Sequence, residues 1–151
     1  MPTLHEYPVR VEWSGGRDGR GLATAHNSGT NLDITVPPEF QGPGGTTNPE
    51  ELLTSAIASC YSITFGIIAA NRKLPIEKLE VSATGVVEQQ GMSFTYKQIT
   101  IRPHITLTAG STEEQAKATL DNAHKADNYC IVTNAVRGKV EVTIEPTVSI
   151  A

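Results

Sequence analysis

Alternating hydrophobic and polar residues predict three short strands in the first third of the chain. The first strand is marked by hydrophobic residues with more polar neighbours, the period of two that is typical of a half-buried strand: Tyr7, Val9, Val11 and Trp13. A glycine-rich turn follows at 14–19, and further strands are expected over 21–25 and 32–36. The proline- and glycine-rich stretch 37–45 is expected to be a loop without regular structure.

The clearest helix start in the sequence follows this loop. Asn48 is a favoured N-cap and Pro49 suits the first helical position. Two acidic residues, Glu50 and Glu51, come next and suit the positive end of the helix dipole. Hydrophobic and small residues then recur at spacings of three and four, which predicts an apolar stripe on a helix that reaches about residue 71: Leu53, Ala56, Ile57, Cys60, Thr64, Ile67 and Ile68.

The second half of the chain predicts a long hairpin and further helices. Alternating hydrophobic residues over 79–87 and 99–107 favour two antiparallel strands. A capping-box signal at 111–114 opens a second helix that runs to about Ala123. Asp127 or Asn128 is expected to cap a short third helix.

Gly138 is expected to end that third helix, and 140–144 alternates as a final strand. Strands therefore come first, then a long helix, two strands, two helices and a strand. This order predicts an α+β fold in a single domain over 1–151, with antiparallel sheets around a long buried central helix.

The central helix also bears on the oligomeric state. Leu52, Ile63 and Phe65 widen its apolar surface, so we expect the helix to be buried on more than one side. A single small sheet covers one side of a helix. A second subunit would cover the rest, which predicts an obligate homodimer.

Composition and charge exclude several classes of function. Twelve basic residues against 16 acidic ones give a net charge of −4, and the basic residues are scattered along the chain. Binding to nucleic acid or to an anionic membrane surface is therefore not expected. No apolar run is expected to span a bilayer, and the first ten residues lack the hydrophobic segment of a secretory signal, so we expect a cytoplasmic protein.

Two cysteines, Cys60 and Cys130, are the main candidates for chemistry. They lie 70 positions apart, and a disulfide in a reducing compartment is usually transient and catalytic or redox-sensing. The alternative is a pair of buried thiols that act as small hydrophobic residues. The cysteines and the four histidines form no set of ligands at metal-binding spacing, so no metal site is predicted.

The sequence leaves open which cysteine attacks. Cys60 lies on the apolar stripe of the central helix, where burial raises a thiol pKa, so a reactive Cys60 needs a nearby cation. Arg17 and Arg20 in the early turn are candidates, although each also suits a solvated loop. Cys130 lies in the first turn of the short helix if that helix begins at Asn128, and the helix dipole would then lower the pKa of Cys130.

Four segments in consistent order over almost the whole chain resemble the OsmC/Ohr family of osmotically inducible and organic hydroperoxide resistance proteins. They are 15–20 (GGRDGR), 44–52 (GGTTNPEEL), 58–60 (ASC) and 130–135 (CIVTNA). The resemblance implies an intertwined homodimer of OsmC-like fold. It also implies a thiol peroxidase that reduces organic hydroperoxides without a cofactor.

In that cycle Cys60 corresponds to the peroxidatic cysteine, and Cys130 would form a disulfide with it. A dithiol reductant, which is a lipoyl group for some members of the family, would then reduce this disulfide. The resemblance assigns Arg17 to hold the thiolate and Glu50 to orient Arg17. Glu50 and Cys60 are ten residues apart, which is about 15 Å along one helix at 1.5 Å per residue. One arginine can hardly contact both within a single chain, so at least one of Arg17 and Glu50 is expected to come from the other subunit.

One departure qualifies the resemblance, and one alternative residue stays open. Many peroxidases of the family have proline directly after the second cysteine, where this chain has Ile131. Arg20 lies three residues after Arg17 and is an alternative activating residue. The competing hypothesis of a different class is a non-catalytic member of the family that binds a small ligand or has a structural role under stress.

Overall fold

Two compact units, Met1–Leu52 and Leu53–Ala151, make up the computed structural model, which describes residues 1–151. Helix α1 (Pro49–Asn71) begins in the first unit and continues through the start of the second. The single domain over 1–151 stays a prediction.

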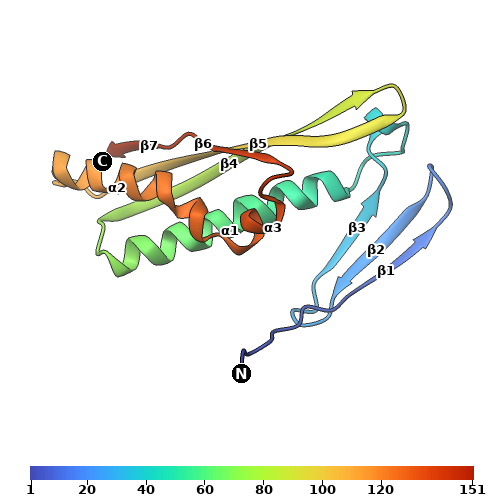
Figure 1. Ribbon diagram of the computed structural model, residues 1–151, viewed down its shortest axis with the longest axis horizontal. Coiled ribbons are helices and arrows are strands. Elements are labelled where there is room, and N and C mark those ends of the chain that lie inside the picture. The colour runs from blue at the N-terminus through green and yellow to red at the C-terminus, as the bar shows by residue number, and fades with distance from the viewer. The chain divides into compact units, whose positions relative to one another are not determined.

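The first unit contains the three predicted strands as an antiparallel sheet. The strands are β1 (Val9–Ser14), β2 (Arg20–Ala25) and β3 (Asn31–Thr35), in the order β1-β2-β3 (Figure 1). The loop at 37–45 was expected to lack regular structure, but it contains a single 3-10 turn, η1 (Pro38–Phe40). Proline at the first position of this turn already has the φ angle that a helical turn requires.

The predicted start of α1 is confirmed. The side-chain oxygen of Asn48 accepts the backbone N–H of Glu51 across 2.8 Å, so Asn48 caps the helix as expected. The carboxylate of Glu51 in turn accepts the hydroxyl of Thr47 across 2.9 Å. These contacts fix the helix start just after the irregular loop.

The packed face of α1 differs from the predicted stripe. The buried residues recur every four positions and are Ile57, Tyr61, Phe65 and Ala69. Ile63 and Ile67 are instead 65% and 57% exposed. The elements of the single chain cover one side of α1, as expected for one small sheet, and burial of the other side by a second subunit stays a prediction.

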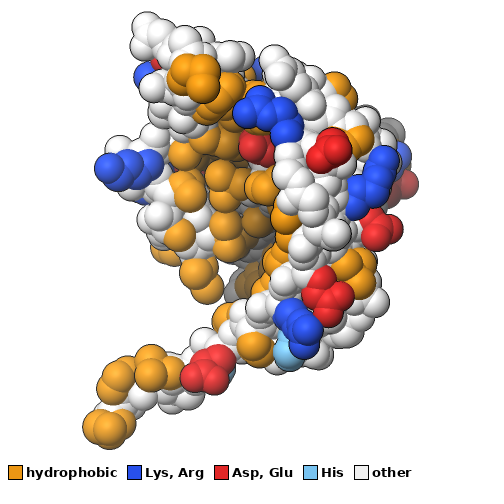
Figure 2. Space-filling view, turned by 90° about the vertical axis from the view of Figure 1, so that its right-hand side faces the viewer, with side chains coloured by type: hydrophobic (Ala, Val, Ile, Leu, Met, Phe, Trp, Pro, Cys, Tyr) orange, Lys and Arg blue, Asp and Glu red, His pale blue; other side chains and the backbone are white.

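The open side of α1 leaves an apolar surface on the chain. Figure 2 shows hydrophobic side chains gathered over one face of the molecule. By length and composition alone, this 23-residue helix is apolar enough to cross a membrane, which corrects the sequence-based expectation that no such segment exists. Its packed face makes it the central helix of the second unit.

The second unit is built on a mixed four-stranded sheet. Strands β4 (Ile76–Gln90) and β5 (Ser93–Leu107) form the predicted antiparallel hairpin, with Gly91 at φ 63° in its turn. The predicted last strand, β6 (Glu141–Ile144), is followed by β7 (Thr147–Ile150), which the sequence analysis missed. Both pair with β5 in parallel, so the α+β fold with antiparallel sheets and a central helix is confirmed with this parallel addition.

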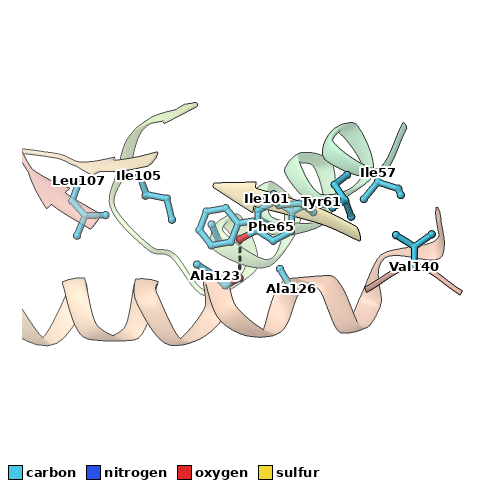
Figure 3. Packing of buried hydrophobic residues seen from close by; sticks show 11 residues of the cluster. Ile57, Tyr61, Phe65, Ile101, Ile105, Leu107, Ala123, Ala126 and Val140 are labelled. Atoms are coloured by element: carbon cyan, nitrogen blue, oxygen red, sulfur yellow. Dashed lines mark hydrogen bonds between the residues drawn. The ribbon is translucent and has the colours of Figure 1, made fainter. Parts of the chain in front are cut away.

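Helices α1 and α2 (Glu113–Lys125) share the core with one face of the sheet (Figure 3). The hydroxyl of Tyr61 on α1 donates to the carbonyl of Ala123 on α2 across 2.7 Å, and Figure 3 shows this bond inside the hydrophobic cluster. Alternate residues of β5 face the helices: Ile99, Ile101, Ile105 and Leu107 are all buried. The long helix is therefore fixed on the side away from Ile63 and Ile67.

The ends of the later helices differ from the prediction in detail. Thr112 is the N-cap of α2, and its capping-box partner is Gln115 rather than a glutamate. After α2 comes a one-turn 3-10 helix, η2 (Ala126–Tyr129), and then α3 (Ile131–Val136). Neither Asp127 nor Asn128 caps α3, because η2 includes both residues and places Cys130 at the N-cap.

Candidate active site

The two cysteines meet in the second unit. Cys60 lies in the middle of α1 and Cys130 is the N-cap of α3, and the Cys130 side chain hydrogen-bonds the sulfur of Cys60. Both are free thiols. Since α1 is fixed by its buried face and η2 leads directly into Cys130, residues 70 positions apart in the sequence form one pair.

The surroundings of Cys60 lower its pKa. Burial raises the pKa of this thiol, but several hydrogen bonds stabilise the thiolate and outweigh burial. The donors are the Cys130 side chain, the backbone N–H of Val132, the Thr64 hydroxyl and the backbone N–H of Ile131. The first turn of α3 thus supplies two N–H groups to a sulfur on another helix.

The surroundings of Cys130 have the opposite effect. Complete burial and the hydrogen bond to Cys60 raise the pKa of Cys130, and contacts with Thr133 offset only part of this. The Thr133 hydroxyl donates to Cys130 Sγ across 3.1 Å, and the Thr133 backbone N–H donates across 3.4 Å. The start of α3 does lower the pKa of Cys130 through Thr133, but burial and Cys60 outweigh this effect, so the expected net lowering is wrong. Cys60 is the thiol that ionises first.

An apolar pocket of about 600 Å³ opens beside Cys60. Residues of α1 line one side of it, and η2 and the start of α3 line the other: Ala56, Ser59, Cys60, Ile63, Thr64, Ile67, Ile68, Tyr129, Ile131 and Val132. Neither Asp nor Glu lines it, and Ile131 is 83% exposed at its rim. The pocket has the size and the hydrophobic lining of a site for a small organic molecule.

Arg17, Arg20 and Glu50 all lie in the first unit. Arg17 is in the turn between β1 and β2, and its Nη1 donates to the carbonyl of Phe40 across 3.4 Å. Arg20 is the exposed first residue of β2. Glu50 lies in the first turn of α1. Their assignment to the Cys60 site stays a prediction.

Sequence reasoning missed the hydrogen-bond donors of the cysteine pair. Thr64 was predicted on the apolar stripe with Cys60, four residues earlier on the same helix face, but without a chemical role. Thr133 stands three residues after Cys130, the spacing at which an N-cap side chain accepts a backbone N–H. Both signals are present in the sequence. No group of three or more His, Cys, Asp or Glu side chains in the chain could hold a metal ion.

A cysteine pair beside an apolar pocket, carried on a central helix and a short capped helix, defines a class of α+β proteins with two adjacent free thiols. The family model described as OsmC-like protein matches residues 42–145. The chain therefore belongs to the OsmC-like protein family, as the sequence resemblance predicted.

Curated relatives and solved structures agree with this membership. The chain is 32% identical over 146 residues to the uncharacterized protein YmaD of Bacillus subtilis, covering 97% of this chain and 96% of the relative. It is 28% identical over 142 residues to an organic hydroperoxide resistance protein-like protein of Staphylococcus aureus, covering 94% and 96%. A crystal structure of an organic hydroperoxide resistance protein OsmC from Legionella pneumophila superposes with a TM-score of 0.70 and 26% identity, covering 98% of this chain and 99% of that one.

Proposed function

We propose that this protein is a thiol peroxidase that reduces organic hydroperoxides to alcohols. The observation that carries the proposal is the pairing of two free thiols, with Cys130 beside Cys60 and Cys60 at the wall of an apolar pocket. A thiolate is the nucleophilic form of cysteine, and hydrogen-bond donors keep Cys60 in that form. Names of relatives that refer to organic hydroperoxide resistance support the same substrate class.

In the first step the Cys60 thiolate attacks the terminal oxygen of the hydroperoxide. A sulfur–oxygen bond forms and the oxygen–oxygen bond breaks, so the sulfur loses two electrons and becomes a sulfenic acid. The alkoxide that leaves takes a proton from water and departs as the alcohol. The apolar pocket would hold the organic group of the substrate while the peroxide faces Cys60.

In the second step Cys130 attacks the Cys60 sulfenic acid. A sulfur–sulfur bond forms, and hydroxide leaves with the proton of the Cys130 thiol as water. A dithiol reductant then reopens the disulfide by two thiol exchanges and is itself oxidised to a disulfide. The cycle needs a reducing compartment, so we infer a cytoplasmic location. The reaction itself uses no cofactor.

Arg17 and Glu50 complete the proposed site from a second subunit of a homodimer. A guanidinium beside the thiolate and the peroxide oxygens would stabilise the negative charge that moves between them, and a carboxylate would orient it. The exposed hydrophobic side of α1, with Ile63 and Ile67, supports a second subunit there.

Peroxide consumption by purified protein tests the proposal. We expect the parent protein to consume cumene hydroperoxide with dithiothreitol and Cys60→Ser to lose turnover. Without dithiothreitol, Cys130→Ser should release about one equivalent of alcohol per chain and accumulate sulfenic acid, because no resolving thiol is present. Equal activity of parent and Cys60→Ser, above that of dithiothreitol alone, would favour the non-catalytic alternative.

A mixed dimer tests the placement of Arg17. Cys60→Ser and Arg17→Ala chains, refolded together at equal amounts, should recover about one quarter of the parent activity if the site is shared, because half of the dimers are mixed and each carries one intact site. A mixture of Cys60→Ser and Arg20→Ala chains is the matched control and applies the same test to Arg20. No recovery in the first mixture would place Arg17 and Cys60 in one chain, whereas full activity of Arg17→Ala protein alone would remove Arg17 from the site.

A further inference from the structure

We propose that Arg137 positions Cys130 for its attack on oxidised Cys60. The inference deepens the proposed function and rests on it, because it assigns a positioning residue to the second step of that cycle. Arg137 is the C-cap of α3, and Cys130 is the N-cap of the same six-residue helix. The two residues therefore stand at opposite ends of a helix about 9 Å long, at 1.5 Å per residue.

The Arg137 side chain runs back along α3 to the segment before Cys130. Its Nη2 donates to the backbone carbonyl of Asp127 across 3.1 Å, and its Nε donates to the side-chain oxygen of Asn134 across 3.0 Å. Asp127 belongs to η2 and Asn134 to α3, so one side chain joins the elements on both sides of Cys130. An arginine suits this role because its donors form a rigid planar fork.

Both backbone groups of Cys130 are held by the residues that Arg137 binds. The Cys130 N–H donates across 3.2 Å to the same Asp127 carbonyl, and the Asn134 N–H donates to the Cys130 carbonyl across 2.9 Å. The Asn134 side-chain amide also donates to the carbonyl of Asn128 across 3.1 Å. The position of Cys130 therefore depends on hydrogen bonds whose other partners Arg137 fixes.

The Asp127 carboxylate is a further partner of Arg137. Asp127 is 8% exposed, and its Oδ2 lies 3.5 Å from Nη2 of Arg137. A buried carboxylate without a partner is costly, so Arg137 also stabilises Asp127 in η2. The simpler role for a cation at the end of α3 is to complement the helix dipole. The hydrogen bonds of Arg137 go instead to Asp127 and to the Asn134 side chain.

The start of α3 acts on Cys60 in two ways, and both depend on its position. It carries Cys130, and it supplies the backbone N–H groups of Ile131 and Val132 to the Cys60 sulfur. Loss of the Arg137 contacts should therefore have two effects together. Formation of the disulfide should slow, and the pKa of Cys60 should rise because its donors are displaced.

A disulfide reagent measures closure of the cysteine pair without peroxide. One equivalent of dithiobis(nitrobenzoate) forms a mixed disulfide with Cys60 and releases one thionitrobenzoate. Cys130 then displaces the second thionitrobenzoate, and the bond between the two cysteines forms. The rate of the second release measures how well Cys130 is placed. Cys130→Ser should give the first release only.

Arg137→Gln tests the positioning role. The second release should slow by about tenfold or more, because a misplacement of about 1 Å can cost about a hundredfold in rate. The pH profile of Cys60 alkylation by iodoacetamide should move to higher pH, which a loss of overall stability in a folded protein would not cause. Arg102→Gln is the matched control and should change neither, since Arg102 is 43% exposed against 44% for Arg137 and pairs with Glu145.

Two further variants separate positioning from the pairing of a buried charge. Asp127→Asn keeps the backbone carbonyl and removes the carboxylate, so Arg137→Gln in this background leaves no unpaired buried charge. The slower second release should persist there. Arg137→Lys keeps the charge but not the planar fork, so it should restore only part of the rate.

An unchanged second release in Arg137→Gln would overturn the inference. So would a slowing that disappears in the Asp127→Asn background, or a full rate in Arg137→Lys. Peroxide turnover separates this inference from the proposed function. If the parent protein does not consume cumene hydroperoxide but Arg137→Gln still slows the second release, the peroxidase proposal fails and the positioning role stands. Turnover by the parent with an unchanged second release gives the reverse result.

Discussion

The hydroxyl of Thr133 donates to Cys130 Sγ across 3.1 Å, and the Cys130 side chain in turn hydrogen-bonds the sulfur of Cys60. Three side chains thus form a relay in which each donor stabilises negative charge on the next sulfur. The relay is local to the start of α3, because Cys130 caps that helix. Its position explains why the pKa values of two adjacent thiols change in opposite directions.

Thr133→Val tests the first link of this relay. Valine has nearly the same shape but no hydroxyl, so the pKa of Cys130 rises further and Cys130 attacks the sulfenic acid more slowly, by about three- to tenfold for one lost hydrogen bond. The lifetime of the sulfenic acid after one equivalent of peroxide measures this effect. Thr119→Val, a buried change whose hydroxyl bonds only within α2, should leave that lifetime unchanged.

The pH dependence of Cys60 alkylation tests the second link. The pKa of Cys60 is lowered, so iodoacetamide should modify it at pH values where an ordinary thiol is still protonated. Cys130→Ala removes a donor to the thiolate, so the profile should move to higher pH. Cys130→Ser retains a hydroxyl donor and should move it less. An unchanged profile in Cys130→Ala would show that the thiol pair does not set the reactivity of Cys60.

Ile131→Pro tests the backbone donor. Proline suits the first position of a helix but has no N–H, so α3 should form while one hydrogen bond to Cys60 is lost. The pKa of Cys60 should rise and peroxide attack should slow. Ile131→Ala keeps the N–H and controls for the side chain. If the alanine variant shows the same rise in pKa as the proline variant, the N–H has no role.

Two substitutions on α1 distinguish its packed and open sides. Phe65→Ala should lower the free energy of unfolding by about 3–5 kcal/mol, because it leaves a cavity in the core. Ile67→Ala should cost less than about 1 kcal/mol in a monomer, because the side chain is exposed. In a dimer that covers Ile67 the cost should grow with protein concentration, which denaturation at two concentrations measures. A cost independent of concentration would contradict burial of Ile67 between subunits.

Much of the fold was predictable because local signals agreed with the tertiary structure. The cap at Asn48, the alternation along β4 and β5 and the glycine at 91 each specify one element. The packed face of α1 was not predictable, since hydrophobic residues lie around most of the helix and no local signal distinguishes Phe65 from Ile67. Strand β7 was missed because its parallel pairing with β5 depends on residues more than 40 positions away.

The candidate site was predictable in its residues more than in its electrostatics. The sequence indicated Cys60 and Cys130 as a pair, and the structure brings them together. The order of their pKa values depends on which sulfur receives the N–H groups of Ile131 and Val132. That is decided by the one-turn helix η2, which no sequence signal indicated.

The elements that carry Cys60 and Cys130 differ in length, and this difference affects how a reductant would recognise the protein. Cys60 is anchored on a 23-residue helix through residues with no solvent exposure, whereas Cys130 sits between a four-residue and a six-residue turn of helix. Any shift that accompanies bond formation between the sulfurs therefore falls on the shorter segment. Tyr129 and Ile131 flank Cys130 and are 70% and 83% exposed, so a shift of this segment on disulfide formation would change the protein surface. A reductant would then distinguish the disulfide form from the dithiol form by the shape of that surface.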